Sequence, residues 1–216
     1  MFYFDALETM RDKQLKKINK QSANLADYQE YWNPDIRREH FVAGWYLPKN
    51  ICSRMIASMD KNWDNGQMDE KRGYWRLTST KNPDKKLEDE YMFHIHNIFE
   101  LYKVKYPWSI KGEPWGVMRP WSYQCFKPGD HYKSKHFECG GPREGKLVRH
   151  FTWLTYLNDI NVNGETELLH QGIKIKPEEG LTVILMAGWT HAHWGNVTYE
   201  KKKYIATGWA SYHHRC

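Results

Sequence analysis

The sequence predicts a mostly β domain with flanking helices (α+β), and three observations lead to this prediction. A chain of 216 residues fits one domain and is long enough to enclose a core. Apolar residues make up 40% of it and aromatic residues 15%, which indicates a globular rather than a disordered or fibrous chain. After Pro120, short segments rich in β-branched and aromatic residues follow one another with no helical pattern between them. Such a series favours an antiparallel sandwich or barrel.

The N-terminal part is organised differently. Residues 1–40 mix charges with scattered apolar positions, interrupted by Pro34, and this indicates a helical or irregular lead-in. The apolar stretch FVAGWYL, residues 41–47, predicts a strand. Pro48 then opens a predicted helix whose apolar residues are four apart: Ile51, Met55 and Met59. A second amphipathic helix is predicted between Lys86 and Tyr106, from the spacing of Leu87, Tyr91, Ile95, Ile98 and Tyr102.

The predicted strands after Pro120 are bounded by the turn signals PGD, NVNG, PEEG and GN. They are WSYQCF, VRHFTWLTYL, TELLH, IKIK, LTVILMA and KYIATGWASY.

Charge and cysteine content bear on the surroundings of the protein. Apolar runs fall far short of the roughly 20 residues that a membrane helix needs. Asp5 and Glu8 stand where a signal peptide would be basic and then apolar. The four cysteines form no CxxC pair, so we expect reduced thiols and a cytoplasmic protein. A net charge of +6 permits an acidic partner, but the single lysine triplet, residues 201–203, does not predict a nucleic-acid site.

Two stretches have metal-ligand chemistry. In KSKHFECGG, His136 and Glu138 would share one face of a strand, and in GWTHAHWG the same holds for His191 and His193 if that segment is extended. Two histidines and a carboxylate from separate strands would make a facial triad, the ligand set typical of non-haem Fe(II). Spacing alone leaves open whether these residues meet, and which histidine would complete the set.

The order of features from Phe126 to Trp209 resembles the 2-oxoglutarate and Fe(II)-dependent dioxygenases of the prolyl 4-hydroxylase type, including phage-encoded members. Six elements match in order: KPGDHYKSKHFE, RHFTWLTYLND, NGETELL, KIKPEEG, GWTHAHWGN and KKYIATGW. Upstream, GWYLPKNICSRMI resembles the strand and helix that begin this family's domain. The resemblance implies a double-stranded β-helix (jelly-roll) core in a domain spanning residues 41–216, with residues 1–40 outside it. For a phage-encoded protein, the location would be the host cytoplasm.

Metal ligands follow from the resemblance residue by residue. His136 and Glu138 match the family's HxD pair, with glutamate in place of the commoner aspartate. The family's distal histidine lies about ten residues before the basic residue that binds the co-substrate, and counting back from Lys203 reaches His193. His193 is therefore the expected third ligand. His191 is the alternative ligand. If it does not bind the metal, we expect it to be a hydrogen-bond donor behind the ligands or a packing residue.

The resemblance also assigns residues to the two substrates. Lys203 and Tyr156 match the pair that binds the far carboxylate of 2-oxoglutarate, although Tyr156 also suits a core position. Thr166 matches a pocket-lining position of the family's GGxT stretch, where Asn163 replaces the first glycine. We expect the protein substrate to meet two residues near the mouth: Arg149, at the start of its strand, and Trp194, directly after the expected ligand. Trp209 resembles an aromatic residue that walls the pocket.

The activity implied is hydroxylation of peptidyl proline with release of succinate and CO2. The reaction would need Fe(II), 2-oxoglutarate and O2, with ascorbate in support. A proline-containing peptide would be the partner, because aromatic grooves suit extended proline segments. The net charge of +6 favours acidic residues in that peptide. Two alternatives stay open: the same chemistry on a free amino acid, nucleobase or other small molecule, and a non-enzymatic, cupin-like metal-binding barrel, which would have no need of Lys203 and Tyr156.

Overall fold

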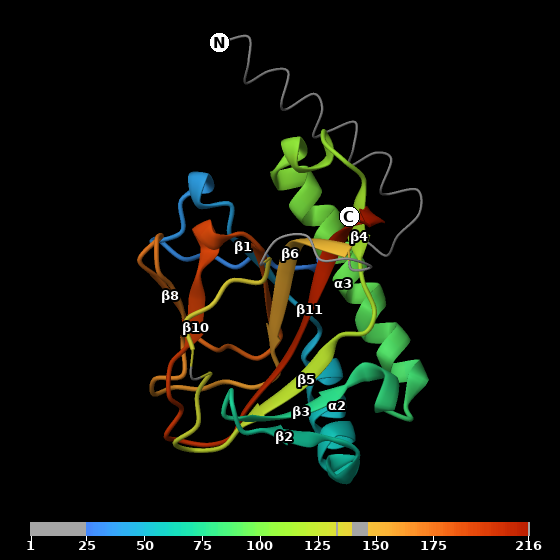
Figure 1. Cartoon of the computed structure of the whole chain (residues 1–216), viewed down its shortest axis with the longest axis vertical. Helices are drawn as coiled ribbons and strands as arrows, with labels where there is room; N and C mark the ends of the chain where they lie inside the picture. Colours follow the sequence, from blue (N-terminus) through green and yellow to red (C-terminus); the bar gives the residue numbers. More distant parts are fainter. Residues whose placement is uncertain (1–24, 133, 140–146, 216) are drawn as a thin grey trace.

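Two antiparallel sheets and two helices make up the computed structural model, which describes residues 25–132, 134–139 and 147–215 (Figure 1). The helices are α2 (Lys49–Lys61) and α3 (Lys85–Lys105). The strands are β1 (Ala43–Tyr46), β2 (Gln67–Asp69), β3 (Tyr74–Thr78), β4 (Trp115–Val117), β5 (Ser122–Phe126), β6 (Leu147–Tyr156), β7 (Thr166–Leu168), β8 (Ile173–Ile175), β9 (Leu181–Met186), β10 (His193–Gly195) and β11 (Lys203–Arg215).

Both predicted helices are confirmed: α3 begins and ends within one residue of its predicted bounds, and α2 begins directly after Pro48. Every apolar position that predicted α3 is buried, because spacings of three and four place those side chains on one stripe of the helix. Asp84 caps its N-terminus by accepting a hydrogen bond from the Leu87 amide at 3.0 Å. The three apolar positions that predicted α2, Ile51, Met55 and Met59, are likewise buried. The two helices therefore present one apolar face each to the sheet behind them.

The large sheet has the order β1-β9-β6-β11-β5-β3-β2, and β4 also pairs with β11. Figure 1 shows β6 and β11 in the middle, with α2 and α3 to one side and the small sheet to the other. Successive side chains of β11 point to opposite faces of the large sheet, so this strand contributes residues to the layers on both sides. Tyr204 and Ala206 pack into the core under the helices, whereas Lys203, Ile205 and Thr207 line a cavity toward the small sheet.

Two hydrophobic cores correspond to these two sides. The larger core lies between the large sheet and the helices and holds Phe99, Phe151 and Trp153 with many further aromatic residues. The smaller core lies between the two sheets and holds Leu154, Tyr156, Leu168, Ile173, Ile175 and Leu185 among others. The second core fills only part of the space between the sheets, and a cavity that contains both polar and apolar side chains lies beside it in the same layer.

The small sheet has the order β10-β7-β8. The chain enters β7 through a turn in which Asn163 and Gly164 have φ values of 58° and 76°. Both residue types tolerate this left-handed conformation, as expected for the position where asparagine replaces a glycine. The turn thus delivers Thr166 onto the first position of β7, facing the large sheet.

Six strands predicted after Pro120 are confirmed as β5, β6, β7, β8, β9 and β11, and the predicted strand at FVAGWYL is β1. The prediction missed β2, β3 and β4, of which β2 and β4 have three residues each, too few to establish a period. His191 and His193 would share one face only if GWTHAHWG were extended, and this is wrong at His191. Trp189–His191 forms a 3-10 turn, and extended structure begins only at His193.

The described part of the lead-in packs onto the domain. Leu25 and Tyr28 belong to the larger core, and the amide of Tyr31 donates to the Gly44 carbonyl at 2.8 Å, so residues 29–31 run along β1 at the edge of the sheet. Residues 1–24 lie outside the described residues, and the boundary at residue 41 stays a prediction. Among the described helices, none is long and apolar enough to cross a membrane.

Candidate metal centre

His136 and His193 face each other across a backbone pair. The amide of His136 donates to the His193 carbonyl at 3.0 Å, and the amide of His193 donates back to the His136 carbonyl at 2.8 Å. Residues that are directly opposite in an antiparallel pair have their side chains on the same face. Their ring centroids are accordingly 4.5 Å apart, although the residues are distant in the sequence.

Glu138 completes a group of three. Its amide donates to the Ala187 carbonyl, just past β9, so the segment that pairs with β10 at His136 reaches the large sheet two residues later. The Glu138 Oε1 atom lies 3.4 Å from His136 Nε2 and 4.0 Å from His193 Nε2. The three ligand atoms lie within 4.8 Å of one another, and no other such cluster of three or more occurs among the described residues.

Hydrogen bonds prepare both imidazoles for metal binding. The Nδ1 atom of His136 is 3.1 Å from the Ser134 carbonyl, and that of His193 is 2.9 Å from the His191 carbonyl. A carbonyl only accepts, so each Nδ1 donates a proton, and in the neutral ring that a metal requires Nε2 carries the lone pair. Burial also lowers the pKa of His193 and so favours the neutral ring that a metal requires.

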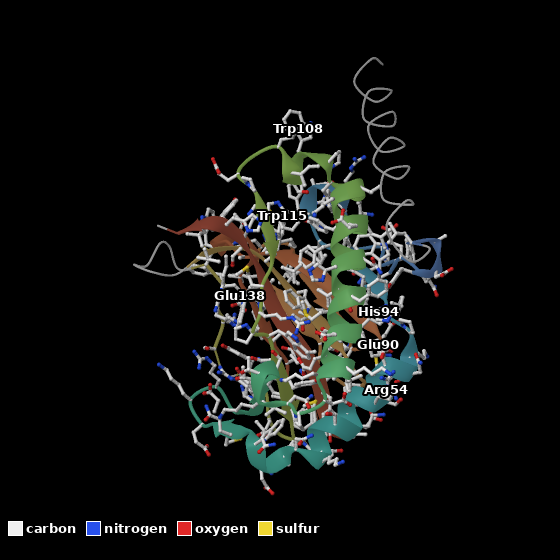
Figure 2. All side chains as sticks on the ribbon, turned by 90° about the vertical axis from the view of Figure 1, so that its right-hand side faces the viewer. Arg54, Glu90, His94, Trp108, Trp115 and Glu138 are labelled. Carbon is white, nitrogen blue, oxygen red and sulfur yellow. The ribbon has the colours of Figure 1, made fainter. Side chains whose placement is uncertain are left out.

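The other carboxylate oxygen of Glu138 is occupied. Oε2 accepts hydrogen bonds from Arg149 Nη1 at 2.9 Å and from the Trp209 indole Nε1 at 2.8 Å. Burial alone would raise the pKa of Glu138, but the hydrogen bond from His136 and the nearby His193 and Arg149 lower it to about 2. Glu138 is therefore ionised at neutral pH, with Oε1 directed to the two histidines (Figure 2 labels Glu138).

These donors fit a divalent transition metal. Two neutral imidazole nitrogens and one carboxylate oxygen on adjoining segments are the 2-His-1-carboxylate set that non-haem Fe(II) takes, with further coordination positions left to other ligands. Cys139 donates its amide to the Ala187 carbonyl and is not part of the cluster.

Lys203 lies in the wall of the same cavity as the three ligands. It is 2% exposed, and its Nζ donates to the Gly164 carbonyl at 2.9 Å and lies 4.8 Å from the Phe126 ring centroid. No carboxylate of the described residues forms an ion pair with it. Burial lowers the pKa of Lys203 to about 8, against a weaker opposing effect of Glu165.

Tyr156 and Thr166 line the cavity with Lys203. The Tyr156 hydroxyl donates to Thr166 Oγ1 at 2.7 Å and is 3.3 Å from the Ile175 carbonyl. Burial raises the pKa of the Tyr156 phenol, which therefore stays protonated. Apart from the three expected metal ligands, the cavity lining thus offers the Lys203 cation, the Gln124 amide and the hydroxyls of Tyr132, Tyr156, Thr166 and Thr207.

Comparison with known proteins identifies the fold of this chain. Neither a protein-family model nor a curated protein sequence matches the chain. A viral collagen prolyl hydroxylase from Paramecium bursaria Chlorella virus-1, solved with 2OG, aligns over 87% of this chain and 96% of its own length, at 17% identity and a TM-score of 0.60. A prolyl-4-hydroxylase from Pseudomonas putida aligns over 81% and 94%, at 15% identity and a TM-score of 0.62. The chain has the prolyl hydroxylase fold.

A third solved structure is a prolyl hydroxylase from Trichoplax adhaerens in complex with a hypoxia inducible factor oxygen degradation domain peptide fragment. It aligns over 98% of this chain and 93% of its own length, at 15% identity and a TM-score of 0.59. These similarities confirm the predicted fold class, with its jelly-roll core.

Within the prolyl hydroxylase fold, His191 points away from the cluster. Its Nε2 lies 2.8 Å from the His40 carbonyl and its Nδ1 3.0 Å from the Thr190 hydroxyl, so both ring nitrogens have partners other than a metal. The packing role considered for His191 agrees with these contacts, and its backbone carbonyl orients the ring of His193.

The two residues predicted to meet the substrate have different surroundings. Trp194 is half-buried, lines the cavity, and has Lys135 Nζ 4.2 Å from its ring centroid. Arg149 contacts Glu138, and its guanidinium lies 3.6 Å from the Trp209 ring centroid. A role for either residue in substrate binding stays a prediction.

Sequence reasoning missed Tyr132. Its ring stacks on that of His136, with centroids 4.1 Å apart and planes 17° from parallel, and also stacks on Tyr74 of β3. An aromatic residue four positions before a histidine is not a signal in itself. The contact depends on where β3 lies, and that strand was not predicted.

Proposed function

We propose that this protein is an Fe(II)- and 2-oxoglutarate-dependent hydroxylase that acts on peptidyl proline and releases succinate and CO2. The observation that carries the proposal is the pairing, in one cavity, of a two-histidine, one-carboxylate cluster with a buried ammonium group that has no carboxylate partner in the described residues. A buried charge is costly unless it is paired, so the ammonium of Lys203 calls for an anionic ligand.

The co-substrate 2-oxoglutarate matches both halves of this cavity because it has a carboxylate at each end. Lys203 would neutralise the carboxylate far from the cluster. The Thr166 hydroxyl would donate a hydrogen bond to it, and so would the Tyr156 hydroxyl on turning its proton from Thr166 Oγ1 to the carboxylate. The keto acid end would then lie toward His136, Glu138 and His193. Binding at two ends fixes the orientation of a flexible diacid, which a single charge could not do.

The metal would be held by Nε2 of His136, Nε2 of His193 and Oε1 of Glu138. Bound Fe(II) with O2 would supply the oxidative decarboxylation of 2-oxoglutarate and the transfer of one oxygen atom to a substrate C–H bond. The apolar residues around the cavity, among them Phe126, Leu154 and Ile205, would exclude water from the reacting groups. A non-enzymatic barrel would have no use for the unpaired lysine.

A proline-containing peptide is the proposed substrate. Support comes from the fold, which this chain shares with prolyl hydroxylases, one of them solved with a peptide fragment. Trp194 lines the cavity and offers an aromatic surface on which a proline ring would pack. The net charge of +6 favours acidic residues near the target proline. We also propose the cytoplasmic location that the cysteine pattern predicts.

The test is to incubate iron-loaded protein with 2-oxoglutarate, ascorbate and a panel of proline-containing peptides that differ in flanking charge. We expect succinate to form and one oxygen to be added at proline, as measured by mass spectrometry. Succinate coupled to oxidation of a free amino acid or nucleotide, with no change in any peptide, would replace the proposed substrate. Metal binding with no succinate from any substrate would support the non-enzymatic barrel instead.

A further inference from the structure

We infer that Arg149 and Trp209 are positioning residues that hold Glu138 as a ligand through a single oxygen. The inference rests on the proposed metal site and extends it to how the longer carboxylate is used. Glu138 stands where the resemblance expects aspartate, and a side chain one methylene longer has more ways to approach a metal. Binding through a single oxygen therefore requires neighbouring groups that restrict the Glu138 side chain.

The contacts of Glu138 provide that restriction. Oε2 accepts from both Arg149 and Trp209, at 2.9 and 2.8 Å, whereas Oε1 lies beside the imidazoles. With two donors on Oε2, a metal in reach of both histidines meets Oε1 alone. The Arg149 Nη1 atom also lies 3.2 Å from the Glu138 backbone carbonyl, so the guanidinium fixes both ends of the side chain.

Arg149 and Trp209 also hold each other. The guanidinium carbon lies 3.6 Å from the indole ring centroid, an arrangement that favours a cation over an aromatic face. Trp209 comes from β11 and Arg149 from β6, two strands that pair with each other. The two side chains that hold Glu138 therefore come from the central strands of the large sheet and not from a loop.

A β-bulge puts Arg149 in this position. Opposite Ala210 and Ser211 of β11 lie Phe151 and Arg149 of β6, so His150 is the extra residue. In a regular strand Arg149 would share a face with Phe151, which is buried under the helices. The bulge turns Arg149 to the opposite face, toward Glu138, while the His150 ring packs against Phe151 with centroids 4.0 Å apart and planes tilted by 60°.

The test measures metal affinity directly, by titrating Mn(II) or Co(II) into metal-free protein. Trp209→Phe removes the indole donor and keeps a ring under the guanidinium, and Arg149→Met removes the charge. We expect each to weaken metal binding by roughly tenfold to a hundredfold, as loss of a ligand's supporting hydrogen bond typically does. The effects should not add, because the two side chains share one acceptor and one stacking contact. Thermal unfolding of each variant separates this effect from loss of fold.

A second arm tests the link to glutamate. Glu138→Asp shortens the carboxylate so that it cannot reach the metal and both donors together, and should weaken binding at least tenfold in the native protein. In the Arg149→Met, Trp209→Phe background the same change should cost clearly less. Equal cost in both backgrounds would overturn the inference, as would unchanged affinity in the two single variants.

The matched control is Arg54→Met, which breaks an exposed, two-contact pair with Glu90 at 2.8 Å between α2 and α3. Figure 2 shows that pair on the helices, well apart from Glu138. Metal affinity should not change in this variant. If the native protein itself binds no divalent metal, the proposed function fails, and that result is distinct from a native protein that binds metal equally well with Arg149 replaced.

Discussion

His193 and His191 are two positions apart, yet the contacts of their rings differ. His193 has one ring nitrogen free and beside Glu138, whereas both nitrogens of His191 lie near oxygen atoms of His40 and Thr190. His193→Ala should therefore lower Mn(II) or Fe(II) affinity at least a hundredfold in a calorimetric titration. His191→Ala should keep metal affinity within about tenfold but lower the free energy of unfolding by about 1–3 kcal/mol, since it leaves a buried carbonyl without a donor. The assignment fails if the His191 variant loses the metal and the His193 variant keeps it.

Lys203 is the residue on which co-substrate binding depends. Lys203→Ala would leave a carboxylate unpaired in a desolvated cavity, at a cost on the order of 3 kcal/mol or roughly a hundredfold in affinity for 2-oxoglutarate. Metal affinity in the absence of 2-oxoglutarate should change little, because Lys203 is not a ligand. Equal 2-oxoglutarate affinity in the variant and the native protein would show that the anion lies elsewhere.

The depressed pKa of Lys203 predicts how 2-oxoglutarate binding depends on pH. Burial lowers this pKa to about 8 in the ligand-free protein, and a bound carboxylate favours the charged form and raises it. Well below pH 8 the lysine is charged in both states, so it contributes no pH dependence there. Above pH 8 the free protein loses the proton that binding requires, and affinity should fall by up to about tenfold per pH unit. In Lys203→Arg, which stays charged, any remaining affinity should show no such fall between pH 8 and 10.

At the scale of the elements, the turn at Asn163 and Gly164 connects backbone conformation to the cavity. Gly164 has a φ of 76°, and its carbonyl accepts from Lys203 Nζ. Gly164→Ala puts a side chain in the left-handed region, 3.1 Å from Ile160 Cγ2, and should cost about 1–2 kcal/mol of stability. It should also weaken 2-oxoglutarate binding measurably, because the turn and Lys203 move together.

Gly172→Ala is the control for that change. Gly172 lies in the turn between β7 and β8, with a φ of 66°. A Cβ atom added there would meet nothing within 4 Å, Lys203 included. It should lose similar stability in thermal unfolding and keep its affinity for 2-oxoglutarate. If both glycine variants bind 2-oxoglutarate alike, the turn does not support Lys203.

Elements with a sustained period could be predicted from the sequence, and others could not. α3 has five apolar positions at helical spacing, and strands such as β9 and β11 are long enough to show their composition. The pair at His136 and Glu138 was found from its spacing of two. Spacing did not identify the third ligand, because the choice between His191 and His193 depends on a 3-10 turn whose last residue is His191. His193 was expected only from the resemblance, by its offset from Lys203. Similarly, no spacing rule predicts that His150 is a bulge residue and so turns Arg149 to Glu138.

For the molecule as a whole, the cavity lies between the two sheets, on the face of the large sheet opposite the helices. Ligands that bind only the folded state should stabilise it. At a hundred times their dissociation constants, each contributes about 2.7 kcal/mol, which for a chain of this size corresponds to roughly 5–10 °C in Tm. Mn(II) and 2-oxoglutarate together should raise Tm more than Mn(II) alone. In Lys203→Ala at the same ligand concentrations the second increment should disappear, and a full increment there would contradict the proposed cavity.

The arrangement of the sheets is the part that the sequence could suggest only through resemblance. Composition predicted a sandwich or barrel, but pairing of β1 with β9 or of β5 with β3 joins segments that no local pattern connects. Lys203 and Tyr156 were placed by their offsets in a known family. Their meeting in one cavity with the metal ligands depends on the register of β11 with β6, where Ile205 lies opposite Tyr156.

The backbone pair between His136 and His193 has a consequence for the order of folding. These two residues are 57 positions apart (193 minus 136), and Glu138 is bonded to a third segment at Ala187. Contacts between distant segments form late because the loops between them must first be closed. No part of the chain can offer all three ligands until β9 and β10 have both docked. Metal uptake should therefore follow chain collapse and mark its completion, so that a metal added during refolding reports the last step rather than starting the first.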